Sequence, residues 1–310
     1  MADIRVSVVV PARNEADTIE ACLKAIFSQS HRPHEVILVD GHSADGTVEK
    51  ARAFPAKILY EDYHTRAGAC QVGVEDSEGE YVAFTDADCI PDKDWLANLL
   101  MEFGDDIAGV GGGMKNVDTD FWGRTMNLVY DSFLGGAELP LARLFKKKQF
   151  VRTIGGLNSI YRKKDLIKAG GFDVKISGAE DLETSTRVRK IGKLIYTPQA
   201  IVFHDHRRGL KEFARQTYRY AAWRRESRIW HVQEFLALLI PVSLVAFLPL
   251  TYWVLLGEAI FYLLVLTAMG IKTAIWEKDI RYLFSIPLVY ALEHSCFVWG
   301  FWRNLIWRWK

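Results

Sequence analysis

Residues 79–92 read GEYVAFTDADCIPD, a short apolar run that ends in two aspartates one residue apart. An apolar run of this length between polar residues is typical of a buried strand. Alternate residues of a strand project to the same side, so we expect Asp86 and Asp88 to point together from the strand's end. Paired carboxylates there could hold Mg²⁺ or Mn²⁺ against a diphosphate. The alternative is a loop that only leads into a helix.

The residues around this stretch alternate between strand-like and helix-like patterns. Arg5–Val10 and Glu35–Asp40 read as buried strands, and residues 19–27 between them carry apolar side chains at helical spacing. Further strands are expected at Lys57–Tyr60, Tyr81–Thr85 and Ile107–Val110, with a helix opening near Lys93. This alternation predicts an α/β fold with a mixed, mainly parallel sheet flanked by helices. In such sheets ligands bind at the carboxyl ends of the strands.

Composition and spacing argue against several kinds of site. The formal net charge is +1, which gives no global attraction to nucleic acid. The four cysteines lack C-x-x-C spacing, so neither a zinc site nor a disulfide framework is indicated. The first strand ends in Pro-Ala-Arg-Asn at residues 11–14 and not in a glycine-rich turn. A dinucleotide cofactor of the Rossmann type is therefore not expected.

The C-terminal part of the chain is far more apolar than the rest. Phe235–Leu256 carries no charge and matches the roughly twenty residues that cross a bilayer core. Two further apolar segments follow, Ala259–Trp276 with Lys272 inside it and Tyr282–Trp302 with Glu293 and His294 inside it. A charge at the bilayer centre costs about 2.5–3.5 kcal/mol, so we expect the third segment to lie in the membrane interface.

These segments predict a C-terminal membrane region at residues 231–310, with two or three hydrophobic helices, after a catalytic domain at residues 1–230. The alternative is a pair of buried core helices in a soluble protein. Basic residues outnumber acidic ones at residues 205–228, and such an excess marks the cytoplasmic side of a span. We therefore expect a multi-pass protein of the cell membrane with a cytoplasmic catalytic domain. Basic and apolar residues also mix at 121–152, which suits membrane lipids or a lipid-phosphate acceptor, or else a solvated loop.

Six segments of the chain occur in an order that resembles the family 2 glycosyltransferases, whose catalytic domain has the GT-A fold. They are VVVPARNEADTIEACL (8–23), ILVDGHSADGT (37–47), GEYVAFTDADC (79–89), GGLNSIYRKKDLIKAGGFD (155–173), GAEDLETSTRVRKIG (178–192) and QTYRY (216–220). The resemblance covers nearly all of residues 4–230. It implies a metal-dependent, inverting transfer of a sugar from a nucleotide-diphosphate sugar, with a UDP-sugar favoured, to a hydroxyl of a lipid-linked or membrane-associated glycan.

The resemblance also implies which residues bind the donor. The residues expected to line the nucleotide site are Pro11, Ala12, Arg13, Glu15 and Asp40, with Asp40 reading the base. Arg66 and Gly68 would close over the donor. Gln216, Arg219 and Tyr220 match the Q-x-x-R-W signature of processive synthases, with Tyr220 in place of Trp. That departure weakens any inference of processivity.

The metal and the catalytic acids are implied by the same match. Asp86 is expected to contact ribose and metal, and Asp88 to be the firmer ligand of Mn²⁺ or Mg²⁺. In the pair Glu180-Asp181, Asp181 would be the general base; alternatively both acids only occupy a helix N-terminus, where the helix dipole favours them. His204, at the end of the strand-like run AIVFH, could add a metal or diphosphate contact, or could simply stack in a polar loop.

The chemistry can be argued from the residue types as well. A divalent cation stabilises the charge that develops on departing phosphates, and a carboxylate can take the proton of an attacking hydroxyl. Two other functions stay open at this point. In a polyprenyl- or dolichyl-phosphate sugar synthase the acceptor is already ionised and needs no base. In a catalytically inactive glycan-binding membrane protein, Asp88 and Asp181 would have no chemical task.

Overall fold

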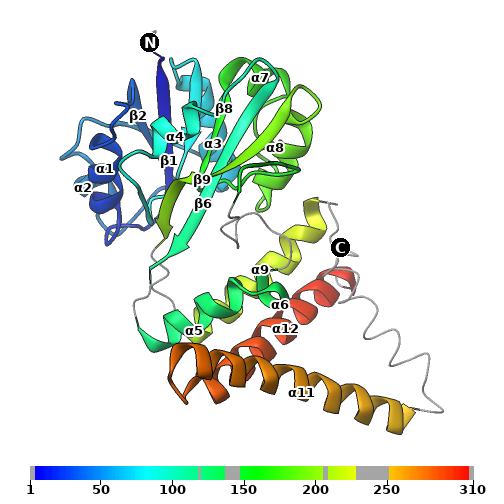
Figure 1. The fold of residues 1–310 in the computed structure, drawn as a ribbon. Helices are drawn as coiled ribbons and strands as arrows, with labels where there is room; N and C mark the ends of the chain where they lie inside the picture. The colour runs from blue at the N-terminus through cyan, green and yellow to red at the C-terminus, as the bar shows by residue number, and fades with distance from the viewer. Residues whose placement is uncertain (1–3, 118–119, 137–146, 205–208, 228–250, 307–310) are drawn as a thin grey trace. The chain divides into compact units, whose positions relative to one another are not determined.

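The computed structural model describes residues 4–117, 120–136, 147–204, 209–227 and 251–306 (Figure 1). These residues form two compact units. Unit 1 comprises the described parts of Met1–Val117 and Leu139–Asp205, and unit 2 those of Asp118–Glu138 and His206–Lys310. The boundary predicted near residue 230 falls outside the described residues.

Unit 1 is built on a nine-stranded sheet (Figure 1). The strands are β1 (Val6–Ala12), β2 (Glu35–Asp40), β3 (Lys57–Tyr60), β4 (Tyr81–Phe84), β5 (Cys89–Pro91), β6 (Ile107–Asn116), β7 (Gln149–Val151), β8 (Ser159–Arg162) and β9 (Lys193–His204). Their order is β3-β2-β1-β4-β8-β6-β9-β5, with β7 paired to β9. The strands β3, β2, β1 and β4 are parallel, and β8 runs antiparallel between β4 and β6. The predicted mixed α/β sheet is therefore confirmed.

Helices cover both faces of this sheet because its central strands are apolar on both sides. The helices of unit 1 are α1 (Ile19–Phe27), α2 (Thr47–Ala51), α3 (Arg66–Asp76), α4 (Trp95–Leu100), α7 (Lys163–Lys168) and α8 (Glu180–Val188). Val8 and Val10 of β1 share a core with α1 and α4, whereas Val9 shares one with α3, α7 and α8. A side chain at Gly73 of α3 would lie 2.4 Å from Val9, so glycine is needed for this close packing.

Two features of the sheet differ from the sequence-based expectation. The strand β4 ends at Phe84, one residue earlier than expected, and a turn follows in which the amide of Cys89 donates to the carbonyl of Asp86 (3.0 Å). Asp86 and Asp88 thus lie in a turn, and the premise that they are strand neighbours is wrong. The strand expected at Ile107–Val110 continues to Asn116, because β6 pairs along its length with β9.

Unit 2 is helical in the residues described. It contains α5 (Phe121–Tyr130), α6 (Phe133–Gly136), α9 (Leu210–Ser227), α11 (Thr251–Glu277) and α12 (Tyr282–Ile306). The long helix α12 contacts α5, α9 and α11, and its Val289 lies in a shared core with Met126 of α5 and Phe213 of α9. Arg124 of α5 also forms an ion pair with Glu277 of α11. Residues 121–130 are therefore part of a packed helix and not of a solvated loop.

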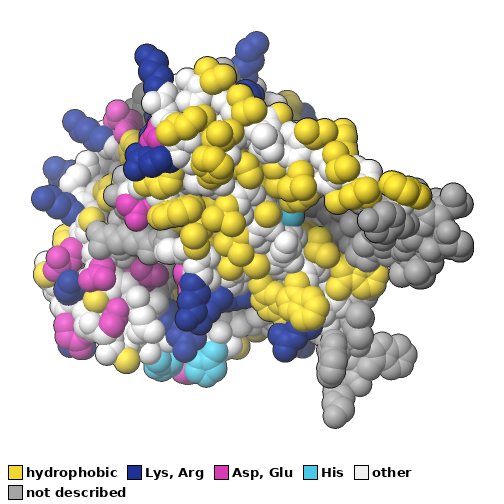
Figure 2. Space-filling view, turned by 90° about the horizontal axis from the view of Figure 1, so that it is seen from below, with side chains coloured by type: hydrophobic (Ala, Val, Ile, Leu, Met, Phe, Trp, Pro, Cys, Tyr) yellow, Lys and Arg dark blue, Asp and Glu magenta, His cyan; other side chains and the backbone are white. Residues whose placement is uncertain are grey.

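Two helices of unit 2 are long and apolar enough to cross a membrane, at Leu256–Glu277 and Tyr282–Arg303. These helices carry exposed apolar side chains, among them Phe261 and Trp276. Figure 2 shows a face of the molecule on which many hydrophobic side chains gather. Such a surface supports membrane association. Most of the predicted span Phe235–Leu256 lies outside the described residues. In α12, Glu293 is buried within unit 2, so this polar side chain does not face the surroundings of the helix.

Candidate active site

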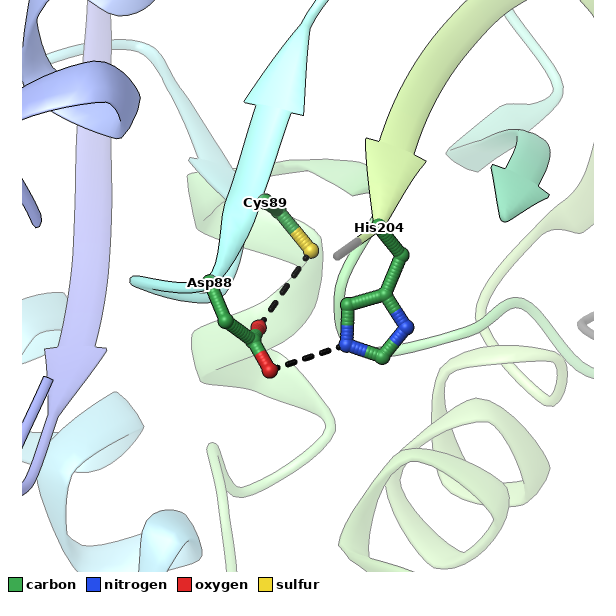
Figure 3. Close-up of side chains that lie close together, drawn as sticks. All are labelled: Asp88, Cys89 and His204. Atoms are coloured by element: carbon green, nitrogen blue, oxygen red, sulfur yellow. Dashed lines mark hydrogen bonds and ion pairs between the residues drawn. The ribbon is translucent and has the colours of Figure 1, made fainter. Parts of the chain in front are cut away.

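The turn between β4 and β5 places Asp88 beside the end of β9 (Figure 3). Cys89 is the register partner of His204 in the antiparallel pair of β5 and β9. Nε2 of His204 lies 2.9 Å from Oδ2 of Asp88, and the Cys89 thiol donates to Oδ1 of Asp88 (3.6 Å). One ligand atom from each of these three residues lies within 4.8 Å of the others. The structure thus brings together Asp88 and His204, two of the three predicted metal ligands.

This group of side chains fits a divalent cation. A carboxylate suits Mn²⁺ or Mg²⁺, and an imidazole nitrogen is a better ligand for Mn²⁺ than for Mg²⁺, which prefers oxygen. Cys89 was not predicted, and its burial raises the pKa of the thiol well above its usual value. In the structure its thiol donates to Asp88, and this contact orients that carboxylate.

The third predicted ligand, Asp86, has a different partner. Its Oδ1 accepts from Nε of Arg66 (2.9 Å) and from Nη2 of Arg66 (2.5 Å). Burial raises the pKa of Asp86, and the charge of Arg66 opposes that rise. Among the described residues the group that could hold a metal comprises Asp88, Cys89 and His204, without Asp86.

Arg66, the first residue of α3, joins the two predicted acidic motifs. Besides Asp86, it binds Oε1 of Glu180 through Nη1 (2.5 Å). A side chain at Gly156 would lie 2.5 Å from this Nη1, so the guanidinium passes directly over a glycine. The guanidinium of Arg66 therefore connects the turn after β4 to the N-terminus of α8, although 114 positions separate Arg66 from Glu180.

Asp181 follows Glu180 in the first turn of α8 and is held by two backbone amides. Gly156 donates to its Oδ2 (3.1 Å) and Leu182 to its Oδ1 (2.8 Å). Burial and the neighbouring charge of Glu180 nevertheless raise its pKa to about 6, while Arg66 opposes this rise. A base whose pKa lies near the working pH is both ionised and able to accept a proton. The two acids thus differ in their contacts: Glu180 binds Arg66, whereas Asp181 is held by backbone amides. The role of Asp181 as the base stays a prediction.

The predicted nucleotide residues gather at the ends of β1 and β2. These strands are parallel, and Ala12 and Asp40 are register partners at their carboxyl ends. Asp40 is buried, and its two oxygens accept from the amide (2.8 Å) and hydroxyl (2.6 Å) of Ser43. Pro11 lies inside β1 and Arg13 is exposed just after it. The amide of Glu15 donates to Oγ1 of Thr47 (2.8 Å), which attaches this loop to α2.

Glu61 is a further acid at this edge that the sequence analysis missed. It follows β3, and its amide donates to the carbonyl of Asp40 (3.2 Å). Its side chain is buried near Gly68, whose own amide donates to the Thr65 hydroxyl at the start of α3 (2.9 Å). The signal was available, because Glu61 directly follows the strand-like run KILY, much as Asp40 directly follows the apolar run VILV.

The remaining predicted donor residues lie on α9 in unit 2. Gln216 donates to the hydroxyl of Tyr220 (2.5 Å), and Arg219 pairs with Glu212 (3.3 Å). Their contact with the donor stays a prediction.

Comparison with known proteins adds independent findings. Residues 7–169, more than half of the chain, match the sequence profile of the family described as glycosyl transferase family 2. The chain is 27% identical over 264 residues to glycosyltransferase AglE of Haloferax volcanii, covering 81% of this chain and 80% of that protein. It is 25% identical over 321 residues to the dolichyl N-acetyl-alpha-D-glucosaminyl phosphate 3-beta-D-2,3-diacetamido-2,3-dideoxy-beta-D-glucuronosyltransferase of Methanococcus voltae, covering 97% of each chain.

Two solved structures share the fold. The mannosyltransferase PcManGT of Pyrobaculum calidifontis, solved with GDP-Man and Mn²⁺, aligns with a TM-score of 0.59 at 20% identity and covers 93% of this chain and 87% of that one. Residues 1–349 of TarS from S. aureus, solved with UDP, align with a TM-score of 0.51 at 19% identity and cover 98% and 93%.

Proposed function

The chain belongs to glycosyl transferase family 2, and from that membership we propose that unit 1 transfers a sugar from a nucleoside-diphosphate sugar to a hydroxyl of a lipid-linked saccharide, with the help of a divalent cation. The chain is a glycosyltransferase with a GT-A fold. The observation that carries the finer proposal is the bridge from Asp86 through Arg66 to Glu180. It joins the turn that carries Asp86 to the first turn of α8, which carries Asp181, and this supports the proposal of a single site.

The donor side of the reaction is assigned to Asp88, His204 and Arg66. Asp88 and His204 would hold Mn²⁺ or Mg²⁺, which when bound neutralises charge on a departing diphosphate. Arg66 adds a fixed positive charge beside the same turn, and a charge that is already oriented requires no reorganisation during the reaction. The proteins that share the fold support this assignment, since one was solved with a nucleotide sugar and Mn²⁺.

The acceptor side is assigned to Asp181. Its carboxylate takes the proton from the acceptor hydroxyl while the oxygen attacks the anomeric carbon. A single displacement on the face opposite the diphosphate inverts that carbon and forms no covalent enzyme intermediate. The two backbone amides hold Asp181 in place, so the side chain loses little freedom when an acceptor binds. Glu180 has a positioning task, because its bond to Arg66 fixes the start of α8.

A lipid-linked saccharide is the acceptor class that the observations favour. The name of the relative from Methanococcus voltae describes transfer to a sugar carried on dolichyl phosphate. The alignment covers nearly the full length of that protein and of this chain. The two candidate membrane helices would keep the enzyme close to such a lipid. We place unit 1 on the cytoplasmic side, because basic residues precede the hydrophobic region. The second candidate acceptor is a polyprenyl or dolichyl phosphate, which would leave Asp181 without a proton to remove.

The donor proposal is tested by thermal unfolding of the full-length chain in detergent with Mn²⁺ and a panel of nucleotide sugars. A donor at 100 times its Kd stabilises the folded state by about 2.7 kcal/mol. We expect a rise in melting temperature that EDTA abolishes and that Asp88→Asn lacks. Asp106→Asn is the matched control, since Asp106 forms an exposed pair with Lys193 (2.7 Å). If no nucleotide sugar raises the melting temperature of the wild-type protein, the proposal is wrong.

The acceptor proposal requires a transfer assay with two lipids in parallel. We expect transfer to a dolichyl-phosphate-linked saccharide and little transfer to dolichyl phosphate itself. The reverse result would identify a lipid-phosphate sugar synthase.

A further inference from the structure

Glu61 lies at the same edge of the sheet as the predicted nucleotide residues. The parallel strands β1, β2 and β3 end side by side, with Ala12 opposite Asp40 and Asp40 opposite Tyr60. Glu61 is the next residue after β3, and its amide donates to the carbonyl of Asp40. Its position therefore matches the rule that α/β sheets bind ligands at the carboxyl ends of their strands.

The Glu61 carboxylate lies between two glycines and a predicted donor residue. A side chain at Gly41 would lie 3.3 Å from Oε1 of Glu61 and 3.4 Å from Cδ of Arg13. A side chain at Gly68 would lie 3.0 Å from Oε2 of Glu61. Glycine at both positions lets the backbone approach the carboxylate, and at Gly68 the side chain of Tyr63 lies at the same point, with its Cβ 2.6 Å from the added carbon. The carboxylate thus lies near Arg13, Asp40 and Gly68, which the family resemblance predicts to bind the donor.

Glu61 lacks the partner that a buried carboxylate requires. Only 3% of the residue is exposed, and its Oε2 is buried without a hydrogen-bond partner. Within the described residues Glu61 forms no ion pair, and no hydrogen bond joins it to the exposed Arg13 beside it. Buried carboxylates are normally paired or hydrogen-bonded, because desolvation of an unpaired charge is unfavourable. An oxygen without a hydrogen-bond partner, at an edge of the sheet where ligands bind, indicates that the ligand supplies the N–H group that bonds to it.

Asp40, the predicted reader of the base, is in a different situation. Both of its oxygens already accept from Ser43. Of the two buried acids at this edge, Glu61 is the one with an oxygen that no protein group satisfies. The polar contact that distinguishes one base from another is therefore better assigned to Glu61.

We propose that Glu61 recognises the base of the nucleotide donor and that this base is guanine. The proposal rests on the proposed function. Guanine carries two neighbouring donors, N1–H and the N2 amino group, which match the two oxygens of one carboxylate. Uracil offers a single N–H between two carbonyls, and a carboxylate repels those carbonyls. Cytosine and adenine have no ring N–H on that side. The proposal departs from the UDP-sugar that the family resemblance favoured.

The test compares the binding of GDP, IDP and UDP to the full-length chain in detergent with Mn²⁺, by titration calorimetry. IDP differs from GDP only in lacking the N2 amino group. A hydrogen bond to a charged group is worth roughly tenfold to a hundredfold in affinity. We expect GDP to bind at least about ten times more tightly than IDP. We expect UDP to bind more weakly than either. Glu61→Gln should weaken GDP by a similar factor and reduce the difference between GDP and IDP.

The matched control is Asp62→Asn. Asp62 is the next residue, its side chain is 90% exposed, and it pairs with His42 (2.8 Å). The Asp62→Asn protein should bind GDP with the same affinity as the wild-type protein. Tighter binding of UDP than of GDP to the wild-type protein overturns the inference, whether or not Glu61→Gln folds. Unchanged GDP affinity in a folded Glu61→Gln protein overturns it as well. Failure of every nucleotide to bind would instead overturn the proposed function together with this inference.

Discussion

Replacing Asp181 with asparagine removes the proposed base and keeps the shape of the side chain. A positioned proton acceptor contributes about 10²–10⁴-fold to a rate. Each factor of ten is about 1.4 kcal/mol, so turnover should fall by the equivalent of about 3–5 kcal/mol in activation free energy. The donor should bind with nearly unchanged affinity, because Asp181 is assigned to the acceptor side. Turnover and donor affinity are measured on one preparation.

The effect of Asp181→Asn on stability can be worked out from its contacts. The asparagine oxygen can accept from only one of the two amides that now bind Asp181, those of Gly156 and Leu182. Loss of one such bond costs about 1 kcal/mol. Removal of the buried charge acts in the opposite direction, since the pKa of Asp181 is raised to about 6. The melting temperature at pH 7 should therefore change little.

The pH dependence gives a second readout for Asp181. Turnover of the wild-type enzyme should decline as the pH falls below about 6, where the base becomes protonated. Stability should move the other way. The folded-state pKa is higher than the unfolded one, so the contribution of Asp181 to stability falls as the pH rises from about 4 to 6. Asp181→Asn should lose both effects.

Glu183→Gln is the matched control for Asp181, because Glu183 lies in the same helical turn and pairs with Arg187 (2.5 Å). It should reduce stability by about 0.5 kcal/mol and leave turnover intact. A folded Asp181→Asn protein with a near-normal rate on a saccharide acceptor would refute the assignment of the base.

Three further predictions concern the metal ligands, the arginine bridge and the membrane. His204→Gln should raise the Mn²⁺ concentration needed for half-maximal activity by about 10–100-fold, as metal titration of activity would show. Gly156→Ala should displace the guanidinium of Arg66, reduce stability by about 1–3 kcal/mol and lower turnover. Gly104→Ala is the control and should change neither stability nor turnover, because no atom lies within 4 Å of its new carbon. The full-length chain should sediment with membranes and resist extraction by salt, because α11 and α12 expose apolar side chains; release by salt alone would exclude these helices as anchors.

The parallel half of the fold was predictable because its signals are local. The runs that form β1, β2, β3 and β4 are apolar over their own few residues, and α1 shows helical periodicity between two of them. The short antiparallel strands were not predicted. Of these, β8 is only four residues long and is defined by its pairing with β4 and β6, which lie far away in the sequence. Pairings of that kind leave little periodic signal.

The candidate site shows the same division. The ordered motifs predicted Asp88, Glu180 and Asp181, and the strand-like run AIVFH predicted His204. The structure places Asp88 beside His204 and Glu180 beside Arg66 in unit 1, and the roles of these residues stay predictions. The contacts among these residues could not be predicted from the sequence. No spacing rule predicts that Arg66 would bind Asp86 and Glu180 at once, since this depends on how three distant segments pack. The charge state of Asp181 likewise depends on burial, which a sequence does not reveal for a polar residue.

The two chain segments that form unit 2 determine which fragments of this protein can be produced in soluble form. Unit 2 is drawn from two separate stretches of chain, Asp118–Glu138 and His206–Lys310, and three of the nine strands of the sheet, β7, β8 and β9, are encoded between them. A shortened chain that stops near residue 230 would keep α5 and α9 but lose α12, against which Met126 and Phe213 pack. Such a fragment would present bare apolar surface and would aggregate. A soluble form of unit 1 instead requires two excisions, one internal and one terminal, so a library of simple C-terminal truncations would not contain it.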